Sequence, residues 1–484
     1  MKKKQKSVKL NMIMNMLLTM SNFIFPIITF PYISRILLPI GTGKVTFATS
    51  VVTYFGMFVQ LGVPTYGVRA CAKVRDDKET LSRIVHELLS INLLMTVVVY
   101  IVYIISLFQV PRFNQDLKLF FILGISIFLN AIGVEWLYKG LEEYGYITVR
   151  SIVFKLIAII AMFLLVHEQK DYILYGGISI FASSASNILN FINLRKFIYL
   201  KSVGNYNVKK HIKYVLIFFA MSVATTIYTN LDNVMLGFMR DDVQVGYYGA
   251  AVKIKTILLS IVTSASTVLL PRASYYVDRG EMDEFYRILK KTMHFIVLVA
   301  FPFSVYFIFF AKEGILFLSG KEYGGAIMPM QVIMPTLLLI GITNVIGIQM
   351  MVPMGREKLV LYSEIAGAVT DLILNAIFIP EFGATGAAIG TLIAEIVVLT
   401  WQILSIKDIR LKIFDEVPWI KLILSVCLAS AASVWIKNVD CNLFVALTVS
   451  AVCFFGIYGI LLLALRDNIM KEIIDSIITK IFKK

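Results

Sequence analysis

The chain has 484 residues, of which 58% are hydrophobic and only 16% are charged, and its mean hydropathy is +0.80. This composition excludes a water-soluble globular protein, because no soluble domain of this length needs so much apolar surface. The net charge of +15 lies in short loops between apolar runs, so it does not indicate nucleic-acid binding. We therefore expect a polytopic helical membrane protein, since a β-barrel would show short alternating segments instead.

Apolar runs recur along the chain, and each is long enough to cross a hydrocarbon core of about 30 Å. We predict fourteen spans joined by short loops: 11–38, 44–67, 84–108, 118–139, 145–166, 172–198, 212–238, 245–271, 293–311, 326–350, 359–379, 385–406, 418–436 and 442–465. The basic start, MKKKQKSVK, leads into a long apolar run without a small-residue cleavage site, so we expect a retained first span and not a signal peptide.

The basic residues set the expected orientation. With the N-terminus in the cytoplasm, 34 of the 46 lysines and arginines fall in cytoplasmic segments and 9 in outer segments. The positive-inside rule therefore predicts a multi-pass protein of the cytoplasmic (inner) membrane with both termini cytoplasmic.

The chain contains an internal repeat. Gly43 stands 26 residues before Arg69, and Gly246 stands 26 residues before Arg272, so a constant offset of 203 residues relates the two copies. Because this offset corresponds to six spans, the copies should have the same orientation, with two six-helix lobes facing one another across a central cavity.

From this repeat we predict an N-lobe (1–200), a C-lobe (201–412), two further spans (413–465) and a cytoplasmic tail (466–484). In the tail, isoleucines form one helical stripe with lysines between them, which predicts an amphipathic helix on the inner leaflet. We expect segments 76–90 and 281–292 to form similar surface helices.

Charged residues inside the predicted spans are the most informative, because a charge at the bilayer centre costs about 2.5–3.5 kcal/mol on insertion scales. Three lie near the middle: Lys155, Asp371 and Glu395. They indicate either a wet cavity or a buried structural pair. Four lie in the outer third: Arg35, Asp232, Lys253 and Lys255. Lys253 and Lys255 point to nearly opposite helix faces, so at most one should face a cavity directly, and Arg35 is equally consistent with an interface anchor.

A further group lies near the inner ends of spans: Arg69, His86, Glu87, Glu135, Arg150, Arg272 and Glu364. For these we expect side chains that extend to the lipid headgroups. Hydroxyl and amide side chains are dense in three spans, between Asn11 and Asn22, between Ser183 and Asn193, and between Thr225 and Asn233. Such groups suit sugar hydroxyls and suit helix–helix hydrogen bonds equally well.

No catalytic or metal-binding pattern is present in the sequence. The four histidines are scattered, HExxH, GxSxG and P-loop motifs are absent, and the four cysteines show no metal spacing. We therefore expect neither an enzyme, nor a cofactor, nor a metal site.

Several segments together resemble the Wzx-type polysaccharide-transport flippases of the multidrug/oligosaccharidyl-lipid/polysaccharide (MOP) exporter superfamily. They are LGVPTYGVRACAKVRDD with KETLSRI, GYYGAAVKI, VLLPRASYY and FGATGAAIGTLIAEI. The resemblance covers the first twelve spans and implies a fourteen-helix, two-lobed, MATE-like fold that works by alternating access. It also implies the cargo, an oligosaccharide repeat unit on a polyprenyl (undecaprenyl) diphosphate, moved to the outer leaflet for capsule or O-antigen synthesis.

One position departs from the related lipid II flippases, which carry an arginine just after the aromatic pair that opens span 8. Here that position falls at about Ala251, and Lys255 lies four residues on, along the same helix face. A lysine there would act as a point charge and not as a bidentate fork.

The expected mechanism follows from these residues. Lys155, Lys253, Lys255 and Arg35 offset the diphosphate charge, while H⁺ or Na⁺ binds Asp371, Glu395 or Asp232. The expected partners are the lipid-linked oligosaccharide, membrane lipids, and a polymerase and chain-length regulator, with no nucleic acid. The alternatives are a multidrug cation antiporter of the same superfamily, a polysaccharide polymerase, and a structural or scaffolding membrane protein, although the last does not explain charges near the middle of the spans. A polymerase should carry a large outer loop, which this sequence lacks.

Overall fold

The computed structural model describes residues 8–406, 413–439, 442–472 and 475, and all of the regular elements in these ranges are helices. Twelve are long and apolar enough to cross a membrane, or thirteen if the bent pair Lys321–Ile333 and Thr336–Met351 forms one span. The stretch Ile13–Lys73 counts once among these, although it contains the first two predicted spans. The predicted polytopic all-helical architecture is therefore confirmed.

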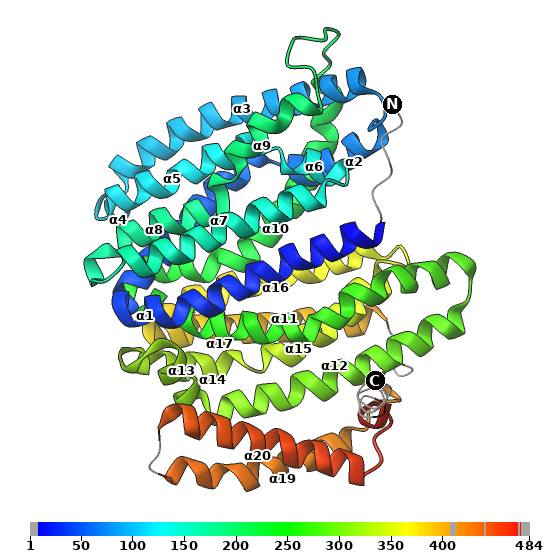
Figure 1. The fold of residues 1–484 in the computed structure, drawn as a ribbon. Helices are drawn as coiled ribbons and strands as arrows, with labels where there is room; N and C mark the ends of the chain where they lie inside the picture. Colours follow the sequence, from blue (N-terminus) through cyan, green and yellow to red (C-terminus); the bar gives the residue numbers. More distant parts are fainter. Residues whose placement is uncertain (1–7, 407–412, 440–441, 473–474, 476–484) are drawn as a thin grey trace. The chain divides into compact units, whose positions relative to one another are not determined.

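The helices form two compact units, Met1–Gly246 and Tyr247–Lys484. The division into lobes 1–200 and 201–412 stays a prediction. In the first unit, the long helices α1, α3, α5 and α7 run along one another, and α8 and α9 complete the bundle (Figure 1). Its elements are α1 (Val8–Gln60), α2 (Val63–Lys73), α3 (Lys78–Gln109), α4 (Pro111–Asn114), α5 (Leu117–Ile132), α6 (Glu135–Gly140), α7 (Tyr144–Leu165), η1 (Gln169–Asp171), α8 (Tyr172–Ile180), η2 (Phe181–Ala185), α9 (Asn187–Asn193), η3 (Leu194–Lys196) and α10 (Lys209–Met239).

Helix α1 is two helices joined at a kink. Leu38 has a φ of 58° and a ψ of 176°, and Pro39 follows it. A proline disfavours helical backbone in the residue before it and provides no N–H for the helix ladder. The kink separates the two stretches that the sequence assigns to spans 11–38 and 44–67.

The second unit begins within α11 (Asp242–Arg279) and continues through a long series of helices. They are α12 (Met282–Phe309), α13 (Ala311–Ser319), η4 (Lys321–Ala326), α14 (Ile327–Ile333), α15 (Thr336–Thr343), η5 (Asn344–Met351), α16 (Glu357–Phe382), α17 (Ala384–Ser405), α19 (Trp419–Val434), η6 (Trp435–Asn438) and α20 (Leu443–Ala464). Two antiparallel pairs, α16 with α17 and α19 with α20, make the densest contacts in this unit.

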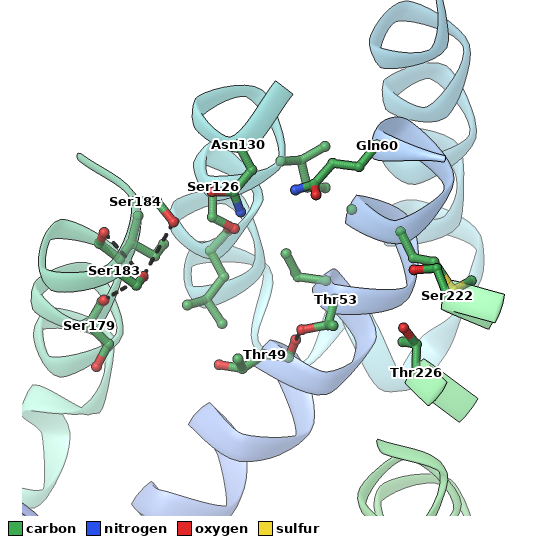
Figure 2. A pocket seen from close by; sticks show the side chains of 16 residues that line it. Thr49, Thr53, Gln60, Ser126, Asn130, Ser179, Ser183, Ser184, Ser222 and Thr226 are labelled. Atoms are coloured by element: carbon green, nitrogen blue, oxygen red, sulfur yellow. Dashed lines mark hydrogen bonds between the residues drawn. The ribbon is translucent and has the colours of Figure 1, made fainter. Parts of the chain in front are cut away.

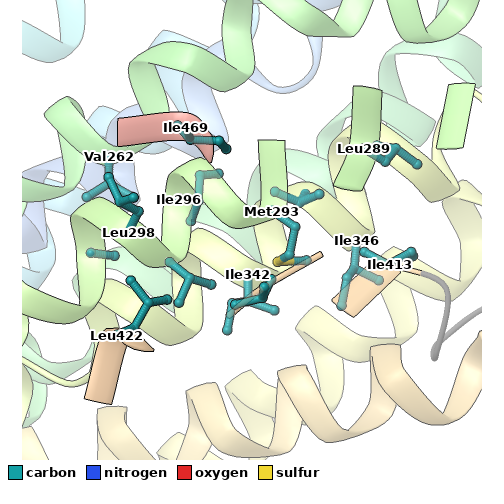
Figure 3. Packing of buried hydrophobic residues seen from close by; sticks show 14 of the residues in the cluster. Val262, Leu289, Met293, Ile296, Leu298, Ile342, Ile346, Ile413, Leu422 and Ile469 are labelled. Carbon is teal, nitrogen blue, oxygen red and sulfur yellow. The ribbon is translucent and has the colours of Figure 1, made fainter. Parts of the chain in front are cut away.

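The apolar core of the second unit gathers around α12. Leu289, Met293 and Ile296 of α12 are fully buried and pack near Ile342 and Leu422 from other helices (Figure 3). In a membrane, lipid tails are as apolar as these side chains, so the hydrophobic effect adds little between helices. Close van der Waals packing therefore stabilises this cluster.

The structure corrects the expectation of surface helices at 76–90 and 281–292. Both segments are the first turns of spanning helices, α3 and α12. Asp77 caps α3 by accepting from the N–H groups of Glu79 (3.0 Å) and Thr80 (3.3 Å). The apolar faces of segments 76–90 and 281–292 are buried in their bundles, as Leu88 and Phe285 show. The apolar stripe of each segment continues into the span that follows it. Of the tail stripe, Ile469 is buried, and the isoleucines at 473, 474, 477, 478 and 481 lie outside the described residues.

Candidate functional site

The first unit contains an open polar cavity of about 420 Å³, which we name the hydroxyl cavity. This volume lies within the range of small-molecule sites. Sixteen residues line it, and ten of them carry a hydroxyl or an amide: Thr49, Thr53, Gln60, Ser126, Asn130, Ser179, Ser183, Ser184, Ser222 and Thr226 (Figure 2). The other six are Val52, Gly56, Met57, Leu123, Ile127 and Ile180.

Helical spacing places these side chains on facing surfaces. Thr49, Thr53, Gly56 and Gln60 are three or four residues apart, so they share one face of α1. Residues 123, 126, 127 and 130 share one face of α5 in the same way, and residues 222 and 226 of α10 are one turn apart. Three elements therefore each contribute one polar stripe to a common space.

The fourth wall comes from a local change of helix type. Residues Phe181–Ala185 form a π-helical segment between α8 and α9, and Ser183 and Ser184 lie within it. Short π segments widen the helix by one residue and are frequent at functional sites. Here the segment turns two neighbouring serines, whose Oγ atoms are 3.3 Å apart, toward the cavity (Figure 2).

Part of the wall presents oxygen lone pairs and not protons. A hydroxyl has one proton and two acceptor positions. Three hydroxyls of the wall donate that proton to a carbonyl oxygen of their own helix: Thr53 Oγ1 to Thr49 O (2.8 Å), Ser126 Oγ to Leu123 O (2.7 Å) and Ser183 Oγ to Ser179 O (2.9 Å). These oxygens remain able to accept hydrogen bonds from a ligand.

A second cavity of about 220 Å³ shares Gln60 and Asn130 with the first, and we name it the charged cavity. Its other lining residues are Pro64, Asn92, Gly133, Val134, Glu135, Trp136, Lys139 and Asn187. Asn92 is 1% exposed, and its side-chain oxygen has no hydrogen-bond partner among the described residues. A buried acceptor of this kind favours a ligand or water that donates to it.

Glu135 contacts two basic residues at this second cavity. Its carboxylate lies 2.8 Å from Lys139 Nζ and 3.6 Å from Arg150 Nη2. Arg150 is only 5% exposed and donates from Nη1 to the carbonyl oxygen of Ser186 (2.6 Å). A single carboxylate therefore partly neutralises two cations that come from α6 and α7.

The predicted cations lie on α1 and α7 of the first unit and on the part of α11 that belongs to the second unit. Lys155 on α7 is half-buried, and its Nζ donates to Ser21 Oγ (2.8 Å) and Asn22 Oδ1 (2.5 Å) on the first part of α1. Arg35 is exposed and donates to the carbonyl oxygen of Pro31. Neither residue lines the hydroxyl cavity. Lys253 and Lys255 are both half-buried on α11, in the second unit.

All three predicted ion-binding carboxylates are buried. Asp232 lies on α10 of the first unit and is 6% exposed, while Asp371 on α16 and Glu395 on α17 are each 3% exposed. Asp371 and Glu395 each lie twelve residues from Gly383, where the α16–α17 hairpin turns, so they share one depth along it. They therefore belong to the same layer of the second unit.

That layer is polar and tightly packed. A Cβ on Gly390 would lie 2.4 Å from Asn375 Oδ1 and 3.2 Å from Asp371 Oδ1, so the glycine leaves room for these two polar side chains in their present positions. Next to it, the hydroxyls of Tyr248 and Thr391 are 3.0 Å apart. Among the residues described, no group of three or more His, Cys, Asp or Glu side chains converges as a metal site.

The polar clusters that contain Ser183, Ser184 and Thr226 stand out in the sequence, where they suit sugar contacts and helix packing equally well, but the stripes on α1 and α5 do not. A signal was present, since Thr49, Thr53 and Gln60 recur at helical spacing inside an apolar run. The expectation that inner-end charges extend to headgroups is wrong for two residues. Glu87 has a fully buried side chain and Arg150 is nearly so, because both have polar partners inside the unit.

Comparisons with known proteins agree with this architecture. A family model described as "Polysaccharide biosynthesis protein" matches residues 8–277, and a second, MatE, matches residues 218–377. A protein of Escherichia coli (strain K12) described as "Putative O-antigen transporter" is 25% identical over 410 residues, which is 84% of this chain and 98% of that protein.

Two solved structures share the fold. The lipid II flippase MurJ in an inward closed conformation superimposes with a TM-score of 0.70 at 18% identity, covering 94% of this chain and all of that one. An inward-facing multidrug resistance MATE family transporter of the MOP superfamily superimposes with a TM-score of 0.63 at 11% identity, covering 83% of this chain and 99% of that one. At these identities the likeness shows the fold alone.

Proposed function

Because the chain belongs to the polysaccharide biosynthesis protein family, with a family-model match over residues 8–277, we propose that it moves lipid-linked oligosaccharides across a membrane. In this proposal it is a flippase of the MOP superfamily that carries polyprenyl-diphosphate-linked repeat units from the inner to the outer leaflet. The product serves capsule, O-antigen or another surface polysaccharide. The protein acts by alternating access as a carrier and not as an enzyme.

The observation that carries this proposal is the hydroxyl cavity inside a bundle of membrane-spanning helices. Ten hydroxyl and amide side chains turned toward one space are costly in an apolar bundle unless they bind something polar. Sugars have hydroxyl groups that match such a wall. The described O-antigen transporter of E. coli supports the same class of cargo.

We assign the diphosphate to the cations that the sequence singles out. Lys155, Lys253, Lys255 and Arg35 are the candidates, and Lys155 is held in place by two side-chain oxygens of α1. Lys139 and Arg150 join this group, since Lys139 lines the charged cavity and Arg150 lies 3.6 Å from Glu135, which also lines it. An anion of the substrate competes with Glu135 for these two cations.

The coupling ion, H⁺ or Na⁺, binds at Asp371, Glu395 or Asp232 in this proposal. All three carboxylates are buried, and a buried carboxylate attracts a cation strongly because little water screens the interaction. An inside-negative potential also favours outward movement of an anionic cargo, by about 2.3 kcal/mol per charge per 100 mV.

For location, we propose the cytoplasmic membrane with both termini inside, consistent with the strong cytoplasmic bias of lysine and arginine. The polymerase and chain-length regulator of the same synthesis are the expected protein partners.

A multidrug antiporter is the second candidate, and the MatE match over residues 218–377 favours it. The lining of the hydroxyl cavity argues against it, because none of the sixteen residues is acidic or aromatic. Organic cations are bound most strongly by such groups.

The experiment that tests the proposal deletes the gene, extracts the polyprenyl-diphosphate glycans and determines which leaflet they occupy. A flippase predicts complete repeat units on the inner leaflet and loss of surface polymer. Single repeat units already on the outer leaflet would place the protein at polymerisation and overturn the proposal. Drug-efflux assays on the same strain test the antiporter.

A further inference from the structure

We propose that the hydroxyl cavity binds an uncharged sugar of the glycan, and that the diphosphate is held elsewhere. This inference rests on the proposed function and deepens it, because it assigns different parts of the cargo to different walls.

The lining carries no net charge. Its polar side chains are serines, threonines, one asparagine and one glutamine, and the remaining six are aliphatic residues, glycine or methionine. A diphosphate in this space would have no cation beside it, and desolvating it would be very costly. A neutral ring has no such penalty.

The direction of the hydrogen bonds also favours a sugar over a diphosphate in this cavity. The hydroxyl protons of Thr53, Ser126 and Ser183 are donated to their own helices, so these side chains offer acceptor oxygens to the cavity. Sugar hydroxyls donate hydrogen bonds and satisfy such acceptors. Phosphate oxygens are acceptors only, and a pair of facing acceptors repels and leaves both unsatisfied.

The amide side chains of Gln60 and Asn130 lie at the boundary between the uncharged lining and the charged cavity. Gln60 and Asn130 lie close together at one end of the hydroxyl cavity (Figure 2), and both also line the charged cavity. Asn130 Oδ1 already accepts from Asn187 Nδ2 (3.0 Å), which leaves the Asn130 amide group as a donor. Charged side chains begin beyond these amides, at Glu135 and Lys139. A sugar therefore fits on one side of the amides and an anionic group on the other.

The site is built for weak binding. Sugar sites of high affinity use aromatic faces, and none lines this cavity. Hydrogen bonds in water contribute only about 0.5–1.5 kcal/mol each in net terms. A carrier needs a cargo site that is favourable enough to fill and weak enough to empty, and a wall of hydroxyls without an aromatic platform meets both requirements.

Gly56 allows the cavity to be blocked without disturbing the fold. It lines the cavity from the middle of the second half of α1, and a Cβ built there meets no atom within 4 Å. A Gly56→Leu side chain therefore enters the open space, and replacing a mid-helix glycine adds helix propensity of up to about 1 kcal/mol. Gly456→Leu on α20 is the matched control, since Gly456 is exposed and its Cβ also meets nothing within 4 Å.

The test uses the full-length protein in lipid nanodiscs and saturation-transfer NMR with four probes. They are methyl glucoside, the methyl glycoside of N-acetylglucosamine, glucuronate and inorganic pyrophosphate. We expect saturation transfer to at least one neutral glycoside with wild-type protein and Gly456→Leu, and a loss of at least tenfold in Gly56→Leu. Pyrophosphate and glucuronate should not displace the neutral probe.

Three results would overturn the inference: no transfer to either neutral glycoside with wild-type protein, equal transfer with both variants, or displacement by pyrophosphate. Leaflet mapping in cells that express the same variants separates the two proposals. If Gly56→Leu moves lipid-linked glycans as well as Gly456→Leu does, the sugar site is refuted and the flippase function stands. If wild-type protein moves none, the proposed function itself fails.

Discussion

Gly43 and Gly246, which the internal repeat makes equivalent, lie against one another. A Cβ on Gly43 would fall 1.7 Å from Asp242 O and 3.0 Å from Gly246 N, and a Cβ on Gly246 would fall 2.1 Å from Pro39 O. Pro39 and Asp242 are themselves 203 residues apart, as the two glycines are. The same backbone contact is therefore made twice, with the two copies exchanged.

This contact leads to the first prediction. Gly43→Ala or Gly246→Ala should lower the stability of the purified protein, because backbone atoms must move to accommodate a methyl group. Overpacking typically costs about 1–3 kcal/mol. The measurement is the midpoint of thermal unfolding in detergent, with Gly56→Ala as the control in open space. Equal midpoints for Gly43→Ala and Gly56→Ala would show that the backbone contact is loose.

The kink beside this contact is a feature that can be predicted from the sequence, whereas the partners of Lys155 cannot. Pro39 and the loop-like LLPIGTG run place a boundary between two spans, and the structure has the kink at Leu38. Lys155 was singled out by its depth in the bilayer, since charge burial is costly anywhere along a span. Its bonds to Ser21 and Asn22 depend on which helix packs against α7, and one sequence does not contain that information.

The hydroxyl cavity could be predicted from the sequence only in part. Clusters of polar residues within one span, such as Ser183 and Ser184, can be recognised in the sequence. Thr49 and Gln60 become significant only when α5 and α10 bring their own stripes to the same space. The π segment at Phe181–Ala185 has no distinct sequence pattern, because its geometry depends on packing around it.

The second prediction concerns Glu87, whose side chain is fully buried. Its carboxylate lies 2.9 Å from Lys210 Nζ and 2.7 Å from His211 Nε2, and it accepts from the N–H of Asn207 (2.5 Å). Glu87→Gln removes the charge that binds α3 to the start of α10. Breaking a buried pair from one side typically costs about 3–5 kcal/mol, so we expect a clear fall in the thermal midpoint.

Glu79→Gln is the control for Glu87→Gln, on the same helix. Glu79 also pairs with a basic residue, Arg83 (3.1 Å), but Glu79 is 62% exposed. Exposed pairs contribute about 0–1 kcal/mol, so the control should unfold close to wild type. A similar fall in the thermal midpoint of both variants would contradict the importance assigned to the burial of Glu87.

The third prediction concerns Asp467, which anchors the start of the tail. Asp467 Oδ2 lies 2.9 Å from His294 Nε2 on α12, and Oδ1 accepts from the N–H of Met470 (2.9 Å). Asp467→Asn removes this anion, and a contact to a charged group is worth about 1.5–3 kcal/mol. Limited proteolysis should cut the tail faster in this variant. Glu472→Gln, whose pair with Lys291 (2.5 Å) is exposed, should behave like wild type.

The same anchor has a defined pH dependence. Burial by itself would raise the pKa of Asp467, but the contact with His294 and the N–H of Met470 outweigh it and hold the pKa below its usual value. A lowered pKa in the folded state gives a stabilisation that is complete above the usual carboxyl pKa of about 3.9 and is lost as the pH falls through the folded value. Protection of the tail should therefore be constant from pH 7 to 5, and loss within that range would contradict the assignment.

The fourth prediction tests the cations assigned to the diphosphate. Lys155→Gln combined with Lys255→Gln should abolish surface polysaccharide while the protein remains at normal levels in the membrane. A contact between a charged group and its partner contributes about 1.5–3 kcal/mol, so the loss of either lysine alone should lower output about tenfold or more. Surface polymer is measured by immunoblot in a deletion strain that expresses each variant.

Lys201→Gln combined with Lys471→Gln is the matched control, because both lysines are exposed and lie outside the spans. It removes the same net charge, so a general effect of charge on membrane insertion or substrate attraction would lower output in both strains. Loss confined to the Lys155/Lys255 variant would locate the effect within the spans. Wild-type polymer in that variant would remove these lysines from the mechanism and leave Arg150 and Lys139, beside the charged cavity, as the cations to test next.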